Sequence, residues 1–244
     1  MSRSKALLVT AGLLAACLVG SGVASAAGGS TGAGDPPRVW SLDSDLAANA
    51  RSDAPGNPFG DSYGAVRVWS MLSTPAGSVT HRPRVYRLLR TFHPNAATCG
   101  VPSIVSWSNS AGAPVVFMNL SNQTYHGTTC GPGQVLRPSA TYVHPSNAPA
   151  AVVIGWKAQV AGTYTITGGV ADADCSGGNG VRWFVDLQAV DIDGGTIDNC
   201  GTARFKAGLT ATVRRGESLY FIVDPNGEWT SDATRVKVTI TATA

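Results

Sequence analysis

Charged residues are scarce in this 244-residue chain, where they make up 14% of the sequence, against about a quarter in most soluble domains. Apolar residues still account for 43%, so the composition excludes a disordered tail and a charged coiled coil. The chain also contains 29 glycines and 14 prolines, which interrupt long helices. These proportions predict a mostly β protein.

Glutamate is nearly absent, because Glu217 and Glu228 are the only two and both lie in predicted turns. Glycoside hydrolysis normally uses two carboxyl groups. The sequence has no His-Glu-x-x-His and no phosphate-binding loop. The histidines show no metal-ligand spacing: His81, His93, His126 and His144. The sequence therefore favours a non-catalytic protein.

Long apolar runs are confined to the N-terminus. Two basic residues precede an apolar stretch over residues 6–19, and Ala24-Ser25-Ala26 provides the small residues that a signal peptidase accepts. We predict a signal peptide over residues 1–26 and a secreted, extracellular protein. Lipid attachment at Cys17 is the alternative. No other run reaches the eighteen or so apolar residues of a membrane span.

The net charge of +3 is mostly a property of that segment, since Arg3 and Lys5 leave with it. A nearly neutral remainder argues against nucleic acid as a partner. Residues 27–37 are too poor in apolar groups to fold and are predicted to be a flexible leader. Residues 38–244 are predicted to form a single, monomeric domain.

Four cysteines remain after Cys17 is removed, an even number in a chain predicted to be exported. None has the close spacing of a zinc or redox site, so two structural disulfides are expected. We favour pairing Cys99 with Cys130 and Cys175 with Cys200, because each bond closes a loop-rich stretch between strand-like segments. The other pairings remain open at this point.

Strand-like segments recur along the chain with turn residues between them. In the last, Val236, Val238 and Ile240 alternate with polar residues, which indicates one buried and one wet face. Residues 151–158 are apolar at alternate positions of both faces, which predicts a strand covered on both sides. Residues 42–50 read as a short helix or as the first strand. The nine clearest segments are 63–72, 85–92, 115–120, 151–158, 162–170, 181–190, 209–214, 218–224 and 234–243. They predict a two-sheet antiparallel β-sandwich of jelly-roll type.

Several turn motifs have a recognisable order. They are Asn57-Pro58-Phe59-Gly60-Asp61, His144-Pro145, Ala161-Gly162-Thr163-Tyr164, Arg215-Gly216-Glu217 and Asp224-Pro225-Asn226-Gly227. In this order they resemble the turns of small secreted bacterial β-sandwich modules that are similar to carbohydrate-binding modules. The resemblance spans roughly residues 45–243, apart from two cysteine-containing insertions, and it implies a jelly-roll fold and glycan binding.

Most aromatic residues are expected to be structural. Trp156 and Trp183 lie within alternating runs and are predicted to belong to the core. Tyr164 is expected to bury its ring while its hydroxyl group finds a backbone partner, as corner tyrosines do. Trp229 is the tryptophan that strand periodicity explains least.

Trp229 with Asn226 and Asp232 is therefore our first candidate for a glycan contact. An exposed indole can stack on the apolar face of a sugar ring while neighbouring amides and carboxylates bind its hydroxyl groups. Tyr125 and His126, between two cysteines, are the second candidate. The alternative is that Trp229 folds back onto the edge of the sandwich.

Two loops of similar composition carry possible calcium ligands. Terminal strands of a jelly roll usually lie near each other, so the loops around Asn57 and Asn226 are expected to meet. The oxygen ligands they would offer calcium are Asp53, Asn57, Asp61, Asp224, Asn226 and Glu228. The alternative is that these residues only shape tight turns.

Charges are segregated along the chain. No acidic residue lies between Asp61 and Asp172, whereas that stretch holds Arg67, Arg82, Arg84, Arg87, Arg90, Arg137 and Lys157. The next stretch is acidic and holds Asp172, Asp174, Asp186, Asp191, Asp193 and Asp198. This asymmetry indicates either a basic surface for acidic glycans or local pairing of arginine with aspartate.

The function predicted from the sequence is that of a secreted, non-catalytic module that binds carbohydrate or a cell-wall polymer, with calcium as a possible structural ion. One alternative is a structural or adhesive extracellular protein without a small ligand. The other is a jelly-roll polysaccharide lyase or hydrolase whose histidine and tyrosine residues are brought together by folding.

Overall fold

The computed structural model describes residues 38–74, 81–95, 101–109, 112–127, 131–146 and 150–243. The predicted signal peptide, the leader, Cys17 and the Cys99–Cys130 disulfide lie outside these ranges and stay predictions. Within them, no helix is long and apolar enough to cross a membrane.

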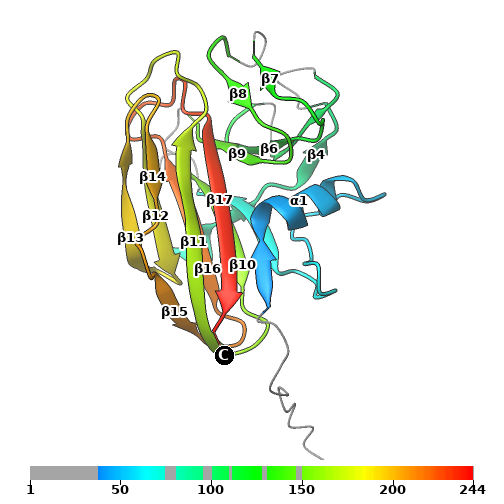
Figure 1. The fold of residues 1–244 in the computed structure, drawn as a ribbon, viewed down its shortest axis with the longest axis vertical. Coiled ribbons are helices and arrows are strands. Elements are labelled where there is room, and N and C mark those ends of the chain that lie inside the picture. Colours follow the sequence, from blue (N-terminus) through cyan, green and yellow to red (C-terminus); the bar gives the residue numbers. More distant parts are fainter. Residues whose placement is uncertain are drawn as a thin grey trace, which may run out of the picture. The chain divides into compact units, whose positions relative to one another are not determined.

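Two antiparallel sheets form the body of the domain (Figure 1). Sheet A contains β1 (Val39–Ser41), β4 (Thr91–His93), β5 (Ile104–Ser108), β6 (Val115–Asn119), β9 (Thr141–His144), β11 (Gly162–Asp172), β14 (Thr202–Arg204), β15 (Thr210–Val213) and β17 (Thr234–Ala242). Sheet B contains β2 (Trp69–Ser73), β3 (Arg87–Leu88), β10 (Val152–Lys157), β12 (Val181–Leu187), β13 (Val190–Ile197) and β16 (Ser218–Asp224). A separate hairpin pairs β7 (Tyr125–His126) with β8 (Val135–Leu136).

The predicted alternation is confirmed in the strands. In β17, Val236, Val238 and Ile240 are buried, and Lys237 is exposed. In β10, every residue from Val152 to Trp156 is buried, as expected of a strand that is covered on both faces. The sequence pattern thus orients both strands correctly. Val152, Ile154 and Trp156 of β10 face the core between the sheets, and Val153 belongs to a second cluster on the outer face.

Residues 42–50 form a helix, α1 (Leu42–Ala50), rather than a strand. Ser41 caps it, because the Ser41 hydroxyl oxygen accepts the backbone N–H of Ser44. Leu42 and Leu46 are fully buried. The carboxylate of Asp45 accepts a hydrogen bond of 2.8 Å from the indole N–H of Trp69, which ties the helix to β2 in sheet B.

The two sheets pack face to face around a tryptophan-rich core. Trp156 and Trp183 are buried, as predicted. The Trp156 ring meets the Tyr164 ring edge-on, with centroids 4.9 Å apart. The Tyr164 hydroxyl group donates a hydrogen bond of 2.7 Å to the carbonyl oxygen of Val160, which confirms the corner role predicted for this residue.

A segment over residues 81–88, including the 3-10 helix η1 (Pro83–Val85), covers the outer face of sheet B. His81 Nδ1 lies 2.9 Å from Oδ2 of the fully buried Asp186. The His81 ring also meets Phe184 edge-on, and the Tyr86 ring meets Tyr220. Burial raises the pKa of Asp186 to about 6, against the opposing effect of His81. This histidine and carboxylate therefore fasten the segment to the sheet.

Local pairing of the basic residues with aspartate is not what the structure shows. Among the described residues, the ion pairs join His81 to Asp186, Arg182 to Asp224 and Arg235 to Asp43. None of them uses an arginine or lysine from the basic stretch between Asp61 and Asp172. Asp191 and Asp193 fall outside the nine predicted strand segments, but they lie in strand β13.

Candidate functional site

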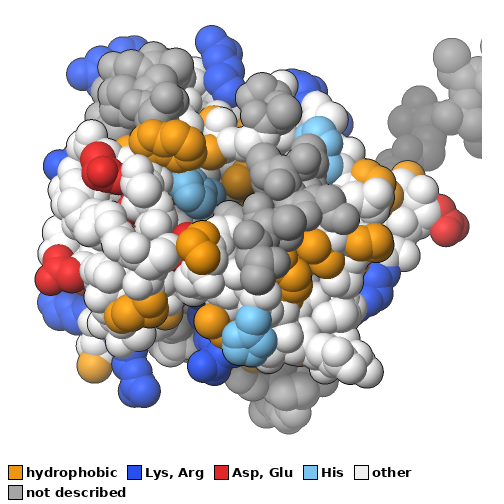
Figure 2. Space-filling model, turned by 90° about the horizontal axis from the view of Figure 1, so that it is seen from above, with side chains coloured by type: hydrophobic (Ala, Val, Ile, Leu, Met, Phe, Trp, Pro, Cys, Tyr) orange, Lys and Arg blue, Asp and Glu red, His pale blue; other side chains and the backbone are white. Residues whose placement is uncertain are grey.

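Three connections between the sheets gather at one end of the sandwich, the upper end in Figure 1. They are residues 173–180 between β11 and β12, residues 198–201 between β13 and β14, and residues 225–233 between β16 and β17. We call this set of three connections the loop end. Figure 2 looks onto it and shows a histidine side chain beside hydrophobic side chains near the centre of the face.

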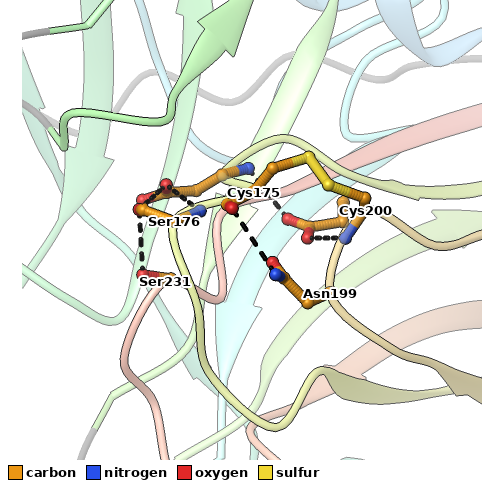
Figure 3. Close-up of a disulfide and its surroundings, with 7 residues drawn as sticks. Cys175, Ser176, Asn199, Cys200 and Ser231 are labelled. Carbon is orange, nitrogen blue, oxygen red and sulfur yellow. Dashed lines mark hydrogen bonds between the residues drawn. A yellow bond between two sulfur atoms is a disulfide. The ribbon is translucent and has the colours of Figure 1, made fainter.

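The Cys175–Cys200 disulfide, which the sequence predicted, joins the first two of these connections (Figure 3). Its Cα atoms are 4.9 Å apart. The backbone N–H of Cys200 donates to Oδ2 of Asp172 at 2.5 Å, and that of Asp174 donates to Oδ1 of the same carboxylate at 2.8 Å. Asp172 is thus oriented by backbone groups on both sides of the disulfide.

The third connection is held against the first by polar contacts. Ser176 Oγ lies 3.3 Å from Ser231 Oγ (Figure 3). The Asn179 side chain donates to the carbonyl oxygen of Asn226 at 2.8 Å. Gly178 has a φ of +90°, and a Cβ there would lie 2.3 Å from the carbonyl oxygen of Thr230. Only glycine fits this close approach of the two loops.

A small pocket lies where the three connections meet. Its polar lining includes Asp172, Asp198, Ser231 and Asp232, and two glycines of the first connection, Gly177 and Gly180, complete one side. The side chain of Asp232 is 2% exposed, and neither of its carboxylate oxygens has a hydrogen-bond partner. A buried carboxyl group in this condition is energetically costly.

The charges around Asp232 increase that cost. Burial is the main cause of a raised pKa, to about 8, and the nearby carboxylates of Glu228, Asp172 and Asp224 raise it further. Asp224 is itself compensated, because Arg182 Nε and Nη2 donate to its Oδ1 at 3.1 and 2.9 Å. Asp232 therefore holds a proton at neutral pH unless a cation takes that role.

Trp229 is the exposed tryptophan of the chain. Five of the six tryptophans are buried, whereas 41% of the Trp229 side chain is exposed. The ring meets His144 edge-on, with centroids 5.7 Å apart. Burial lowers the pKa of His144, which therefore supports the indole as a neutral ring. Trp229 thus lies outside the buried core, with its ring against His144 of β9.

Tyr125 and His126, the second candidate, lie in β7 of the hairpin near the same end. His126 is exposed, and Tyr125 is half-buried against a cluster that includes Ala173 and Ala233. The hairpin is bound to the loop end, because the backbone N–H of Val135 donates to the carbonyl oxygen of Ala173 at 2.9 Å. Both sets of candidates thus contact the same part of the fold.

The two loops proposed to hold calcium do not meet, and that part of the sequence prediction is wrong. Phe59 bridges to Trp69, which is level with Trp156 and Leu219 across sheet B. Asp224 lies five residues further along β16, or about 17 Å away. The described residues contain no group of three or more histidine, cysteine, aspartate or glutamate residues that could hold a metal ion.

The candidate calcium ligands instead have structural partners. The Asn57 amide donates to the carbonyl oxygens of Met71 and Leu89 at 2.6 and 2.8 Å. Asp61 accepts the indole N–H of Trp40 at 2.7 Å. Both glutamates lie in turns as predicted: Glu217 accepts the backbone N–H of Arg214, and Glu228 accepts that of Thr230. Asp53 is exposed beyond the end of α1.

Replacing Asp232 with asparagine is expected to change how stability depends on pH. Between about pH 4 and pH 8 the folded protein holds a proton that the unfolded chain has released, so stability falls as pH rises through this window. An asparagine side chain at this position cannot ionise. The Asp232→Asn variant should exceed the wild type by about 1–3 kcal/mol in unfolding free energy at pH 8 and match it near pH 4.

Denaturant unfolding at pH 4, 6 and 8 measures this difference. Asp53→Asn makes the same charge change at an exposed site and serves as the control. Parallel stability curves for the wild type and Asp232→Asn would show that the Asp232 carboxyl group is not perturbed.

Comparison with known proteins finds similar solved structures but no matching family. No family model matches the chain, and no curated protein matches it. A CBM51 of Clostridium perfringens GH95 in complex with methyl-galactose is 14% identical, with 55% of this chain and 91% of that chain covered and a TM-score of 0.34. A native family 35 carbohydrate-binding module of Clostridium thermocellum is 12% identical, with 58% and 89% covered and a TM-score of 0.29.

A third similar structure contains the CBM51-2 module of Clostridium perfringens ZmpB in complex with GlcNAc, together with INT domains. It is 12% identical, with 45% of this chain covered and a TM-score of 0.32. The match spans 23% of the length of that protein. All three structures contain carbohydrate-binding modules.

Proposed function

We propose that the protein is a non-catalytic module that binds carbohydrate at its loop end. The observation that carries this proposal is the exposure of Trp229 in a protein whose other tryptophans are buried. An indole edge supported by His144 leaves an apolar ring available for a sugar. Polar groups of Asn179, Asn226 and Ser231 lie in the connections around it and can bind hydroxyl groups.

Trp229→Ala is expected to weaken binding to a polysaccharide at least about ten-fold, as loss of a central aromatic anchor does. The probe is a panel of immobilised plant, fungal and bacterial cell-wall polysaccharides, and the measurement is the fraction of protein retained. Because Trp229 lies on the surface, its removal should change the unfolding free energy by no more than about 0.5 kcal/mol.

Tyr63→Ala is a matched control. Tyr63 is also exposed, at 47%, but its hydroxyl group is bound to the backbone of Val39, which pairs with Thr241 at the opposite end of β17. Its removal should leave retention unchanged. Equal retention of wild type and Trp229→Ala would reject this site. Release of unsaturated sugars absorbing in the ultraviolet would instead indicate a lyase.

The remaining sequence predictions belong to the same proposal. They are export after removal of residues 1–26, a single monomeric domain over 38–244, and a jelly-roll connection of the two sheets. Alternation of β9, β10, β11 and β12 between sheets A and B supports the jelly-roll assignment. Structural calcium also stays a prediction, which calorimetric titration with calcium chloride tests directly.

A further inference from the structure

All the charged residues that line the pocket at the loop end are acidic. Its charged lining residues are Asp172, Asp198 and Asp232. Glu228 is close enough to raise the pKa of Asp232. Within the described ranges, no basic side chain lines the pocket, and the neighbouring Arg182 is already engaged by Asp224. The pocket therefore favours a ligand group that carries positive charge.

Asp232 is the residue that a positively charged ligand group would contact in this pocket. Its side chain is almost fully buried and lines the pocket, yet both carboxylate oxygens lack a hydrogen-bond partner. Buried carboxyl groups are normally paired or hydrogen-bonded. Two free acceptor oxygens at the wall of a pocket are what a cationic hydrogen-bond donor requires.

The number of ligands distinguishes an ammonium group from a metal ion. Calcium takes six to eight oxygen ligands, and no group of three or more suitable acidic, histidine or cysteine residues is assembled in the described part of the chain. An ammonium group has three donors. The two oxygens of Asp232 and the hydroxyl group of Ser231, on the same lining, can provide three acceptors.

The pocket also lies within reach of Trp229. Asp232 follows Trp229 by three residues in one connection, so their Cα atoms are at most about 11 Å apart. That separation suits an oligosaccharide with one ring on the indole and a substituent of the same or the next ring in the pocket. Resting on the carbohydrate-binding function above, we infer that the ligand is a saccharide with free primary amines, such as a de-N-acetylated hexosamine polymer.

At neutral pH, the contact between Asp232 and a sugar amine needs no proton from solvent. Asp232 holds one proton before binding, and a neutral sugar amine can accept it, which leaves a carboxylate beside an ammonium group. An N-acetylated sugar has no basic amine and cannot form this pair. A uronic acid polymer would bring another negative charge to Asp172, Asp198 and Glu228, so it is disfavoured.

Calorimetric titration of the full chain at pH 7.5 tests the inference. The probes are glucosamine oligomers, N-acetylglucosamine oligomers of the same length, and oligogalacturonate. Wild type should bind the amine form about ten-fold more tightly than the acetylated form, and the preference should shrink as salt is added. Asp232→Asn should lose the preference, whereas the control Asp53→Asn should keep it. A thermal unfolding transition checks that both variants are folded.

The outcomes separate this inference from the proposed function. Equal binding of amine and acetylated oligomers by the wild type would overturn the amine inference and leave the glycan-binding function in place. Retention of the preference in Asp232→Asn would also overturn it. Binding of calcium chloride at the expense of the amine would make the pocket a metal site and overturn it as well. Failure to retain the protein on any polysaccharide would instead reject the proposed function.

Discussion

Replacement of Trp156 by alanine is expected to lower the free energy of unfolding by about 3–5 kcal/mol. The side chain is fully buried at the centre of sheet B, in register with Trp69 on one side and Leu219 on the other. Its ring meets those of Trp40 and Tyr164 edge-on, at 5.3 and 4.9 Å. Truncation leaves a cavity between the two sheets that this rigid arrangement cannot close.

Denaturant unfolding followed by circular dichroism measures the loss. Trp156→Phe retains an aromatic ring, so its loss of unfolding free energy should be less than half of that of Trp156→Ala. Trp229→Ala removes the same number of atoms from the surface and should lose almost nothing. A similar loss for Trp156→Ala and Trp229→Ala would contradict the division between core and surface tryptophans.

The second large effect is expected from removing the Cys175–Cys200 disulfide. The bond closes a sequence separation of 25 residues, for which the chain-entropy model gives about 3–4 kcal/mol. Replacement of both cysteines with serine should lower the unfolding free energy by that amount. The connection over residues 173–180 should also become sensitive to protease, because the polar contacts of Ser176 and Asn179 are then its main anchors.

Limited proteolysis and thermal unfolding of the double variant measure both effects. Wild type treated with a reductant that opens this bond should behave like the double variant. Unchanged stability in the double variant would show that the loop contacts alone fix the connection.

Much of the fold follows from local pattern. Strands such as β10, β16 and β17 combine β-branched residues, regular alternation and clear turn residues, and their predicted bounds agree closely with the structure. Prediction missed other strands, among them β5, β9 and β13. β13 contains Asp191, Asp193 and two glycines, and it forms a strand because it pairs with β12 along the edge of sheet B. Pairing of this kind is tertiary information that alternation does not carry.

The candidate site likewise combines residues that the sequence indicated with residues that only the fold brings together. Trp229 could be found from the sequence, because it lies outside any alternating segment. Asp232 was predicted as a polar contact beside it, but its burial was not foreseen. Asp172 and Asp198 were not among the candidate site residues. Asp172 ends β11 and Asp198 follows β13, so they meet Asp232 only in the folded chain. The cysteine pattern was the one sequence feature that indicated this meeting, because Cys175 and Cys200 follow them closely.

The expectation that the two candidate calcium loops meet failed for a geometric reason. It assumed that neighbouring terminal strands bring their loops together. β1 and β17 do pair, but the loop around Asn57 crosses to sheet B and is level with the start of β2, through the Phe59–Trp69 bridge. The loop around Asn226 follows the other end of β16. Neighbouring strands therefore do not guarantee neighbouring loops, since an antiparallel sheet has connections at both of its ends.

The position of β17 determines when this domain can fold. The strand comes last among the described elements, yet it pairs with β11, β9 and β1 in the interior of sheet A. Until the ribosome has added residues 234–242, sheet A is split into separate pieces whose apolar faces lack their partner. Folding must then wait for contacts that span almost the whole domain, from Trp40 to Ile240. Such long-range closure makes folding slow.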